Sequence, residues 1–229
     1  QYLLNNNIIF LNHGSFGACP KPVFNKYQQW QSLIESQPVQ YFSNDIYNYL
    51  NKSREDLSSF ISCDADDIIF IQNPTTAINS IIRSLKFDNN HEVLTSNHEY
   101  GAMIRAWSWF SKDKKYNLIE NNLNVPFTTK SNFVDDFWKG VSKNTKIIFI
   151  SHITSPSAII FPIEEICQRA RNEGLMTIID GAHVPGHIDL HISNFNPDIY
   201  IGACHKWLSA PKGSSFMYVK KEIQYLIDP

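Results

Sequence analysis

The stretch from Met176 to Trp207, MTIIDGAHVPGHIDLHISNFNPDIYIGACHKW, decides the fold. It holds two short apolar runs, MTIID at Met176–Asp180 and DIYIG at Asp198–Gly202, and polar residues follow each run. Runs that are apolar almost throughout are typical of strands covered on both faces of a sheet. The stretch therefore predicts two buried strands, with Asp180 at the end of the first and Lys206 just beyond the second.

The same alternation of a short apolar run, a turn and a helical stretch continues through the rest of the chain. This alternation is typical of a parallel sheet with crossover helices. We therefore predict an α/β fold, a mostly parallel sheet sandwiched by helices. Further strands are expected at Asp67–Gln72, His91–Ser96, Tyr116–Ile119, Lys146–Ser151 and Ser215–Val219, and helices at Lys21–Gln37, Asp45–Phe60, Thr76–Ser84, Gly101–Lys112, Asn132–Val141 and Ile163–Glu173. Asp45 is expected to cap its helix, and Gly174 to end the last one.

Composition excludes several classes of protein. The chain has 229 residues, 43% of them hydrophobic, with 20 basic against 22 acidic side chains. Disordered chains, coiled coils and strongly basic nucleic-acid binders have other compositions. No apolar run approaches the roughly 20 residues of a membrane-spanning helix, and the first residues lack the features of a signal peptide. We expect a globular protein of the cytoplasm that binds neither nucleic acid nor membrane.

The cysteines suggest no metal or disulfide framework. Cys19, Cys63, Cys167 and Cys204 are widely separated and form no CxxC pair. We expect most of them to be small buried apolar residues. The chain also opens without Met and stops without a helix-ending signal, which leads us to expect a fragment.

Polar residues cluster where the predicted strands end, and ligands bind at that edge of an open α/β sheet. Thr75 and Thr76 follow the strand at Asp67–Gln72 and precede a helix. Backbone N–H groups, hydroxyls and the positive helix end would meet there in a natural anion site, which a phosphate would fit. The alternative is that one threonine only caps the helix.

Asp180 and Lys206 are each unusual in their context. A carboxylate at the end of an apolar strand loses solvation, so it needs a cationic or N–H partner. A helix cap or an internal ion pair would also satisfy Asp180. Lys206 is flanked by His205 and Trp207 rather than by surface charges, and partial desolvation would favour its amine as a Schiff-base nucleophile.

Together these residues match the needs of pyridoxal phosphate: a phosphate seat, a carboxylate for the pyridinium nitrogen and an amine for the aldehyde. Tyr100, at another strand end, is in position to lay its ring over the cofactor, and His183 to hydrogen-bond the phenolic oxygen or to stack nearby. Taken singly, an aromatic residue or a histidine is more often a packing residue.

Two long motifs resemble the signature of the class V, fold-type I pyridoxal-phosphate enzymes. They are IDGAHVPGHIDL at 179–190 and DIYIGACHKWLSAPKGSSFMYV at 198–219. Five further motifs resemble the isopenicillin N epimerase-like branch of this family. They are LNHGSFG at Leu11–Gly17, PVQYF at Pro38–Phe42, NPTTAIN at Asn73–Asn79, HEYGA at His98–Ala102 and SHITSPSAIIFPI at Ser151–Ile163. The resemblance covers nearly the whole chain.

Matched position by position, the resemblance assigns the central residues. Lys206 would form the Schiff base and act as the catalytic base, and Asp180 would hold the pyridine nitrogen. Thr75 with the backbone of Thr76 would bind the phosphate, with His205 beside it.

Other positions follow the epimerase-like branch. Tyr100 falls where desulfurases have a histidine that stacks on the ring, Ser155 where many members have an asparagine near the phenolic oxygen, and His183 where a glutamine is common. Ala203 is a departure, since relatives often have a Ser or Asn there that contacts the phosphate.

The resemblance also implies a domain organisation. Residues 1–20 would form an N-terminal active-site loop, with His13, Gly14 and Ser15 on the substrate side. Residues 21–229 would form the cofactor-binding large domain. The small C-terminal domain of the family, which often supplies a carboxylate-binding arginine, would be missing.

The reaction stays open between epimerisation, transamination and lyase chemistry at the α-carbon of an amino-acid substrate. The resemblance favours an epimerase-like enzyme acting as a homodimer. Two alternatives are a cysteine desulfurase-like enzyme and a cofactor-binding fragment without turnover. A metal site is the weakest hypothesis, because no HExxH or CxxC spacing supports one. Its candidate ligands would be His98, His152, His183, His187 and His205.

Overall fold

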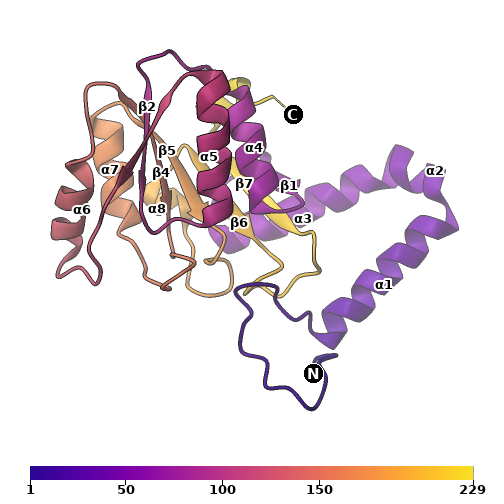
Figure 1. The fold of residues 1–229 in the computed structure, drawn as a ribbon. Helices are drawn as coiled ribbons and strands as arrows, with labels where there is room; N and C mark the ends of the chain where they lie inside the picture. The colour runs from indigo at the N-terminus through magenta and orange to yellow at the C-terminus, as the bar shows by residue number, and fades with distance from the viewer. Residues whose placement is uncertain (229) are drawn as a thin grey trace.

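A seven-stranded sheet forms the centre of the computed structural model, which describes residues 1–228. The strand order is β1-β7-β6-β5-β4-β2-β3 (Figure 1). β7 runs antiparallel to β1 and β6, and the other neighbours are parallel, so the predicted mostly parallel sheet is confirmed. The strands are β1 (Ile68–Ile71), β2 (Glu92–Ser96), β3 (Asn117–Asn121), β4 (Thr145–Ser151), β5 (Met176–Gly181), β6 (Ile199–Ala203) and β7 (Ser215–Val219).

Helices cover both faces of the sheet (Figure 1). One apolar cluster joins the sheet to α4 and α5, and a second joins its other face to α3, α6, α7 and α8. β6 is buried along its whole length, and β5 is buried at every residue except Met176, so their apolar runs match the prediction for strands covered on both faces. The bounds are α3 (Ile46–Ile61), α4 (Pro74–Ser84), α5 (Gly101–Lys114), α6 (Lys130–Trp138), α7 (Ile163–Asn172) and α8 (Ile192–Phe195), with 3₁₀ turns η2 (Ala65–Asp67) and η3 (Lys221–Leu226).

An N-terminal arm extends away from the body of the molecule (Figure 1). It consists of α1 (Lys21–Ser36), α2 (Pro38–Gln40), the π-helical turn η1 (Tyr41–Asp45) and the first part of α3, whose last turns pack on the sheet through Leu57 and Ile61. No residue of α1 is buried. The predicted cap at Asp45 is wrong: the residue is itself helical, because Pro38 starts the helical stretch. Proline suits a first helical turn, since it has no N–H to leave unpaired.

The start of α4 also differs from the prediction. Asn73 caps the helix, and its Oδ1 accepts the Thr76 N–H at 2.9 Å. α4 therefore begins at Pro74, two residues before the predicted start, and neither threonine is the cap. At the end of α7, Gly174 adopts a left-handed φ of 70°, as predicted for the residue that ends this helix.

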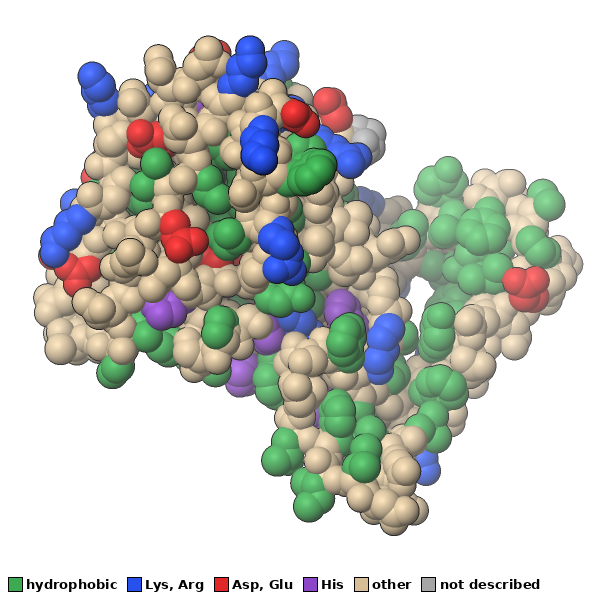
Figure 2. Space-filling view, viewed as in Figure 1, with side chains coloured by type: hydrophobic (Ala, Val, Ile, Leu, Met, Phe, Trp, Pro, Cys, Tyr) green, Lys and Arg blue, Asp and Glu red, His purple; other side chains and the backbone are tan. Residues whose placement is uncertain are grey.

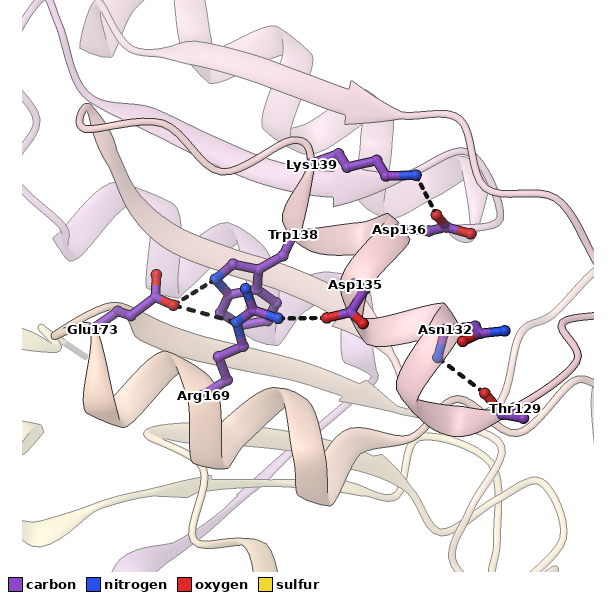
Figure 3. Close-up of polar contacts among 8 residues, drawn as sticks. All are labelled: Thr129, Asn132, Asp135, Asp136, Trp138, Lys139, Arg169 and Glu173. Carbon is purple, nitrogen blue, oxygen red and sulfur yellow. Dashed lines mark hydrogen bonds and ion pairs between the residues drawn. The ribbon is translucent and has the colours of Figure 1, made fainter.

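A polar cluster joins α6 to α7 (Figure 3). Arg169 donates to Asp135 at 3.0 Å and to Glu173 at 3.3 Å, and its guanidinium lies over the Trp138 ring, 4.6 Å from the centroid. The Trp138 indole N–H donates to Glu173 at 2.8 Å. α6 itself starts earlier than predicted, because Thr129 caps it by accepting the N–H of Asn132 at 3.1 Å.

Within the described residues, no helix is long and apolar enough to cross a membrane. The parallel strands β2, β4, β5 and β6 all end at one edge of the sheet. Polar side chains follow each of them there, so this edge is where the candidate site lies.

Candidate active site

A cavity of about 340 Å³ opens at the carboxyl edge of the parallel strands. Its walls come from the N-terminal segment, from the start of α4 and α5, and from the ends of β4, β5 and β6. Most of the predicted site residues line it, although they are far apart in the sequence. They are Thr75, Tyr100, Ser155, Asp180, His183, His205 and Lys206.

Asp180 is the buried carboxylate of the cavity, with 4% of its surface exposed. It lies near the end of β5, and its Oδ1 accepts the Ala182 N–H at 3.0 Å. Burial raises the pKa of this carboxyl, while the Ala182 N–H and the ammonium form of Lys206 lower it. The side chain is thus poised for a cationic or N–H partner that enters the cavity.

Lys206 reaches the same cavity from the turn after β6. Its Nζ lies 3.2 Å from His183 Nε2 and 5.9 Å from the centroid of the Tyr100 ring. Burial lowers the pKa of the Lys206 ammonium, and Asp180 acts in the opposite direction. Burial also lowers the pKa of His183, to about 4, with the charge on Lys206 as a further cause. At neutral pH the Lys206 Nζ therefore faces a neutral imidazole.

Thr75 and Thr76 line different hollows in the structure. Thr75 lines the cavity in the first turn of α4, where backbone N–H groups have no acceptor within the helix. Thr76 lies outside it, against a neighbouring hollow that Ser214 and Gln72 also line. Its N–H and its hydroxyl both point at Asn73 Oδ1, at 2.9 and 3.2 Å. The Thr76 backbone is thus already engaged by the helix cap.

His205 and Tyr100 close two sides of the cavity. His205 is buried, and its Nδ1 lies 2.9 Å from the Ser214 carbonyl oxygen, which fixes the ring. Tyr100 is 46% exposed and immediately precedes α5, so its ring forms part of the open side. Ser155 is exposed at the mouth of the cavity, in the turn after β4.

The N-terminal segment packs directly onto the site. The Gly17 N–H donates to the His205 carbonyl at 3.1 Å. A Cβ on Gly17 would lie 2.1 Å from the Lys206 carbonyl oxygen, so only glycine permits this approach. Gly14 lines the cavity, together with Ser15 and Phe16. His13 lies outside the lining, beside Trp207, with their ring centroids 6.2 Å apart.

Glu99 and Ser151 are two buried residues that the sequence reasoning missed. Ser96 donates to Glu99 Oε1 at 2.6 Å, and the Ser151 hydroxyl donates to the other carboxyl oxygen. Burial raises the pKa of Glu99 to about 8, and the neighbouring Asp180 acts in the same direction. Ser151 lines the cavity and pairs with Asp180 between β4 and β5. The position of Ser151 at the end of an apolar run was the sequence feature that could have indicated it.

The remaining histidines are dispersed. His98 Nε2 lies 2.9 Å from the Leu123 carbonyl oxygen, and His152 Nδ1 lies 3.1 Å from the Tyr200 hydroxyl. His187 stacks on Trp207. Across residues 1–228, no group of three or more His, Cys, Asp or Glu side chains is arranged to hold a metal ion.

The fold and the cavity define an α/β protein in which a lysine and a buried carboxylate line one cavity at the carboxyl edge of the sheet. Residues 15–229 match the aminotransferase class-V family. The chain therefore belongs to that family, whose members are pyridoxal-phosphate enzymes, as the sequence motifs predicted.

Individual relatives point to several reactions. The isopenicillin N epimerase of Streptomyces clavuligerus is 30% identical over 221 residues, which cover 96% of this chain and 55% of the relative. A probable chloroplastic L-cysteine desulfhydrase of Arabidopsis thaliana is 25% identical, over 92% of this chain and 48% of its own. The chain thus spans about half the length of the curated relatives it matches.

Solved structures share the fold. The cystine C-S lyase C-DES, in complex with cysteine persulfide, superimposes with a TM-score of 0.90 at 19% identity, over 98% of this chain and 60% of its own. A mutant of C-DES with glycine covalently linked to its pyridoxal-phosphate cofactor gives 0.88 at 18% identity, over the same shares. The fold predicted for the class V enzymes is confirmed.

Proposed function

We propose that this chain binds pyridoxal phosphate in the cavity at the strand ends and serves an enzyme that acts at the α-carbon of an amino acid, in the manner of isopenicillin N epimerase. One observation carries the proposal. The Lys206 amine and the buried Asp180 carboxylate, on the ends of adjacent strands, line a single cavity. The match to the class-V family supports it.

The residues present fit this cofactor. Asp180 has one hydrogen bond from Ala182 and suits a protonated ring nitrogen as a second partner. Lys206 supplies an amine with a lowered pKa for the aldehyde carbon. Thr75, in the first turn of α4, and His205 would hold the phosphate. Because Asn73 engages the Thr76 N–H, a role for Thr76 requires that the phosphate displace this cap.

In the proposed mechanism the bound cofactor supplies an electron sink for the negative charge that develops on the α-carbon. The Lys206 Nζ would take the α-proton of the substrate. Asp180 would hold the ring nitrogen in its protonated form. Tyr100 would stack on the ring, and His183 would hydrogen-bond its phenolic oxygen, with Ser155 nearby.

A cysteine-cleaving lyase is the second candidate, because desulfhydrases also appear among the relatives at 25% identity. The two reactions differ after α-proton removal: an epimerase returns the proton on the other face, whereas a lyase loses the β-substituent. Incubating the protein with isopenicillin N and, separately, with L-cysteine distinguishes them by chiral chromatography and sulfide release. A cofactor-binding fragment without turnover would give neither product.

A homodimer is also part of the proposal. Large apolar side chains are exposed along the N-terminal arm, where they gather in the space-filling view (Figure 2). They include Leu33, Val39, Phe42, Tyr47 and Leu50. Sedimentation velocity tests the proposal, since a monomer at micromolar concentration would contradict it. The cytoplasmic location stays a prediction from the sequence.

The proposed function is tested by absorption. Protein that is loaded with excess pyridoxal phosphate and then freed of unbound cofactor by gel filtration is expected to show a yellow band that borohydride removes. Lys206→Ala should abolish it, whereas Lys139→Ala, at an exposed lysine of the α6–α7 region, should leave it unchanged. A wild type that is colourless after loading at saturating cofactor and gel filtration would overturn the proposal.

A further inference from the structure

Trp207 lies outside the cavity lining and contacts His183, which lines the cavity. Its indole N–H donates to His183 Nδ1 at 3.3 Å. His187 stacks on the indole, with 4.3 Å between ring centroids. A Cβ on Gly14 would lie 3.2 Å from Trp207 and 3.3 Å from the His183 ring, so the N-terminal segment closes over both rings. The indole and the imidazole are therefore held in fixed positions.

This contact restricts the protonation of His183. An indole nitrogen can only donate a hydrogen bond, so Nδ1 of His183 must carry a lone pair toward it. A neutral imidazole has one proton, which must then be on Nε2. Burial keeps this ring neutral at pH 7, because the pKa of His183 is lowered to about 4.

The tautomer in turn restricts Lys206. Its Nζ lies 3.2 Å from His183 Nε2. If Nε2 carries the proton, Nζ has to accept it, which only the uncharged amine can do. An ammonium would instead need a lone pair on Nε2. That would move the imidazole proton to Nδ1, where it would face the indole N–H, donor against donor.

We propose that Trp207 is a positioning residue that fixes His183 as the Nε2–H tautomer and thereby holds Lys206 as the uncharged amine, the form that can attack an aldehyde. The contribution amounts to one hydrogen bond, that from the indole, which exists only when Lys206 is uncharged. Trp207 lies outside the cavity lining. Its effect on the charge of Lys206 does not depend on the proposed function, whereas the use of the uncharged amine against an aldehyde rests on it.

Other groups around Lys206 favour different charge states. The Asp180 carboxylate, after β5, favours the ammonium, and so does the face of Tyr100 at 5.9 Å from Nζ. Burial opposes the ammonium. His187 and His13 lie beside the Trp207 ring, and His187 also lowers the pKa of His183. Because these forces oppose one another, the single hydrogen bond from Trp207 shifts the balance measurably.

The test uses protein without cofactor, so it stands apart from the absorption experiment. Long-range ¹⁵N–¹H spectra of histidine-labelled protein report the tautomer of each ring, and His183→Gln assigns the signal. Trace acetylation across pH 6–11, read by mass spectrometry, gives the pKa of Lys206. We expect the Nε2–H tautomer in the wild type. In Trp207→Phe we expect a shift toward Nδ1–H and a roughly fivefold fall in the ratio of Lys206 amine to ammonium at pH 8, which is the factor that loss of one hydrogen bond of about 1 kcal/mol gives.

Trp138→Phe is the matched control, because it removes an indole N–H donor from the distant α6–α7 cluster. It should change neither measurement. An Nδ1–H tautomer in the wild type overturns the proposal by itself, even if Trp207→Phe does not fold. A folded Trp207→Phe with unchanged tautomer and unchanged Lys206 reactivity overturns it as well. A protein that fails to take up the cofactor yet shows the predicted tautomer would contradict the proposed function alone.

Discussion

Two groups of charged residues in this molecule are built in opposite ways. On the surface of α6 and α7, Arg169 meets Asp135 and Glu173 in direct ion pairs, with side-chain exposures of 39, 65 and 40%. At the carboxyl edge of the sheet, Asp180 is buried and Lys206 is half-buried, and the Lys206 Nζ lies within hydrogen-bond distance of a histidine. The first group is paired and solvated, and the second is desolvated and incompletely paired.

The different burial of the two groups indicates different roles, structural for the exposed cluster and functional for the strand-end pair. Exposed ion pairs gain little, about 0–1 kcal/mol each, because water screens them. Burying Asp180 and Lys206 costs free energy, and that cost shows as a raised pKa for the carboxyl and a lowered pKa for the ammonium. Buried charged groups with strongly shifted pKa values cluster at functional sites, where a ligand can compensate the free energy lost on burial. The strand-end cavity is therefore the region expected to respond to a ligand.

The largest effect is expected from Asp180→Asn. The amide keeps an acceptor for the Ala182 N–H but cannot pair with a protonated ring nitrogen. Leaving that charge unpaired costs about 3 kcal/mol or more, so the cofactor should bind on the order of a hundredfold more weakly. Spectrophotometric titration measures this affinity.

The same substitution should not destabilise the protein without cofactor, because it removes a buried carboxylate. Its melting temperature is expected to equal or exceed that of the wild type. Asp135→Asn, on the exposed cluster, should leave cofactor affinity unchanged. If Asp180→Asn bound the cofactor as tightly as the wild type, the distinction between the two regions would fail at its main point.

A smaller effect is expected from Glu99→Gln. Burial raises the pKa of Glu99 to about 8 from 4.5, so the folded state holds a proton that the unfolded state releases. The free energy of unfolding then falls as pH rises from 4.5 to 8, at about 1.4 kcal/mol per pH unit, which is roughly 2 kcal/mol between pH 6.5 and 8.

Glu99→Gln should remove this slope. The difference between variant and wild type is clearest from pH 6.5 to 8, where His152 and His183, each with a pKa of about 4, are neutral in the folded state. Urea unfolding at a series of pH values measures it. Parallel pH profiles for the two proteins would show that Glu99 is ionised in the fold.

The smallest effect is expected from Arg169→Met on the exposed cluster. The variant loses two ion pairs and a cation–π contact with Trp138, and the free energy of unfolding should fall by about 1 kcal/mol. Added salt should shrink the difference from the wild type, and cofactor affinity should not change. A loss above 3 kcal/mol would mean that exposed pairs contribute as much here as buried groups.

The sequence predicted the sheet well because buried strands are continuous apolar runs. MTIID and DIYIG both became buried strands, and Asp180, at the end of the first, and Lys206, beyond the second, line one cavity. The strand-end rule for α/β sheets made this possible. Helix starts were less predictable, because Asn73 competed with Thr75 and Thr76 for the cap, and single-residue patterns do not decide such competitions.

Contacts between residues far apart in the chain could not be predicted from the sequence. Glu99 accepts hydrogen bonds from Ser96, three residues away, but also from Ser151, 52 residues further on, and only the β2–β4 pairing brings that residue near. Trp207 looked like a neighbour of Lys206, yet its hydrogen bond goes to His183. Such partners depend on the register of the sheet, which the apolar pattern alone does not fix.

The most direct measurement of the central claim is to locate the covalent attachment. Protein incubated with pyridoxal phosphate is reduced with borohydride and digested, and the phosphopyridoxyl mass is mapped by mass spectrometry. The account predicts near-stoichiometric modification of Lys206. Modification spread over exposed lysines, with the Lys206 peptide unchanged, would contradict it.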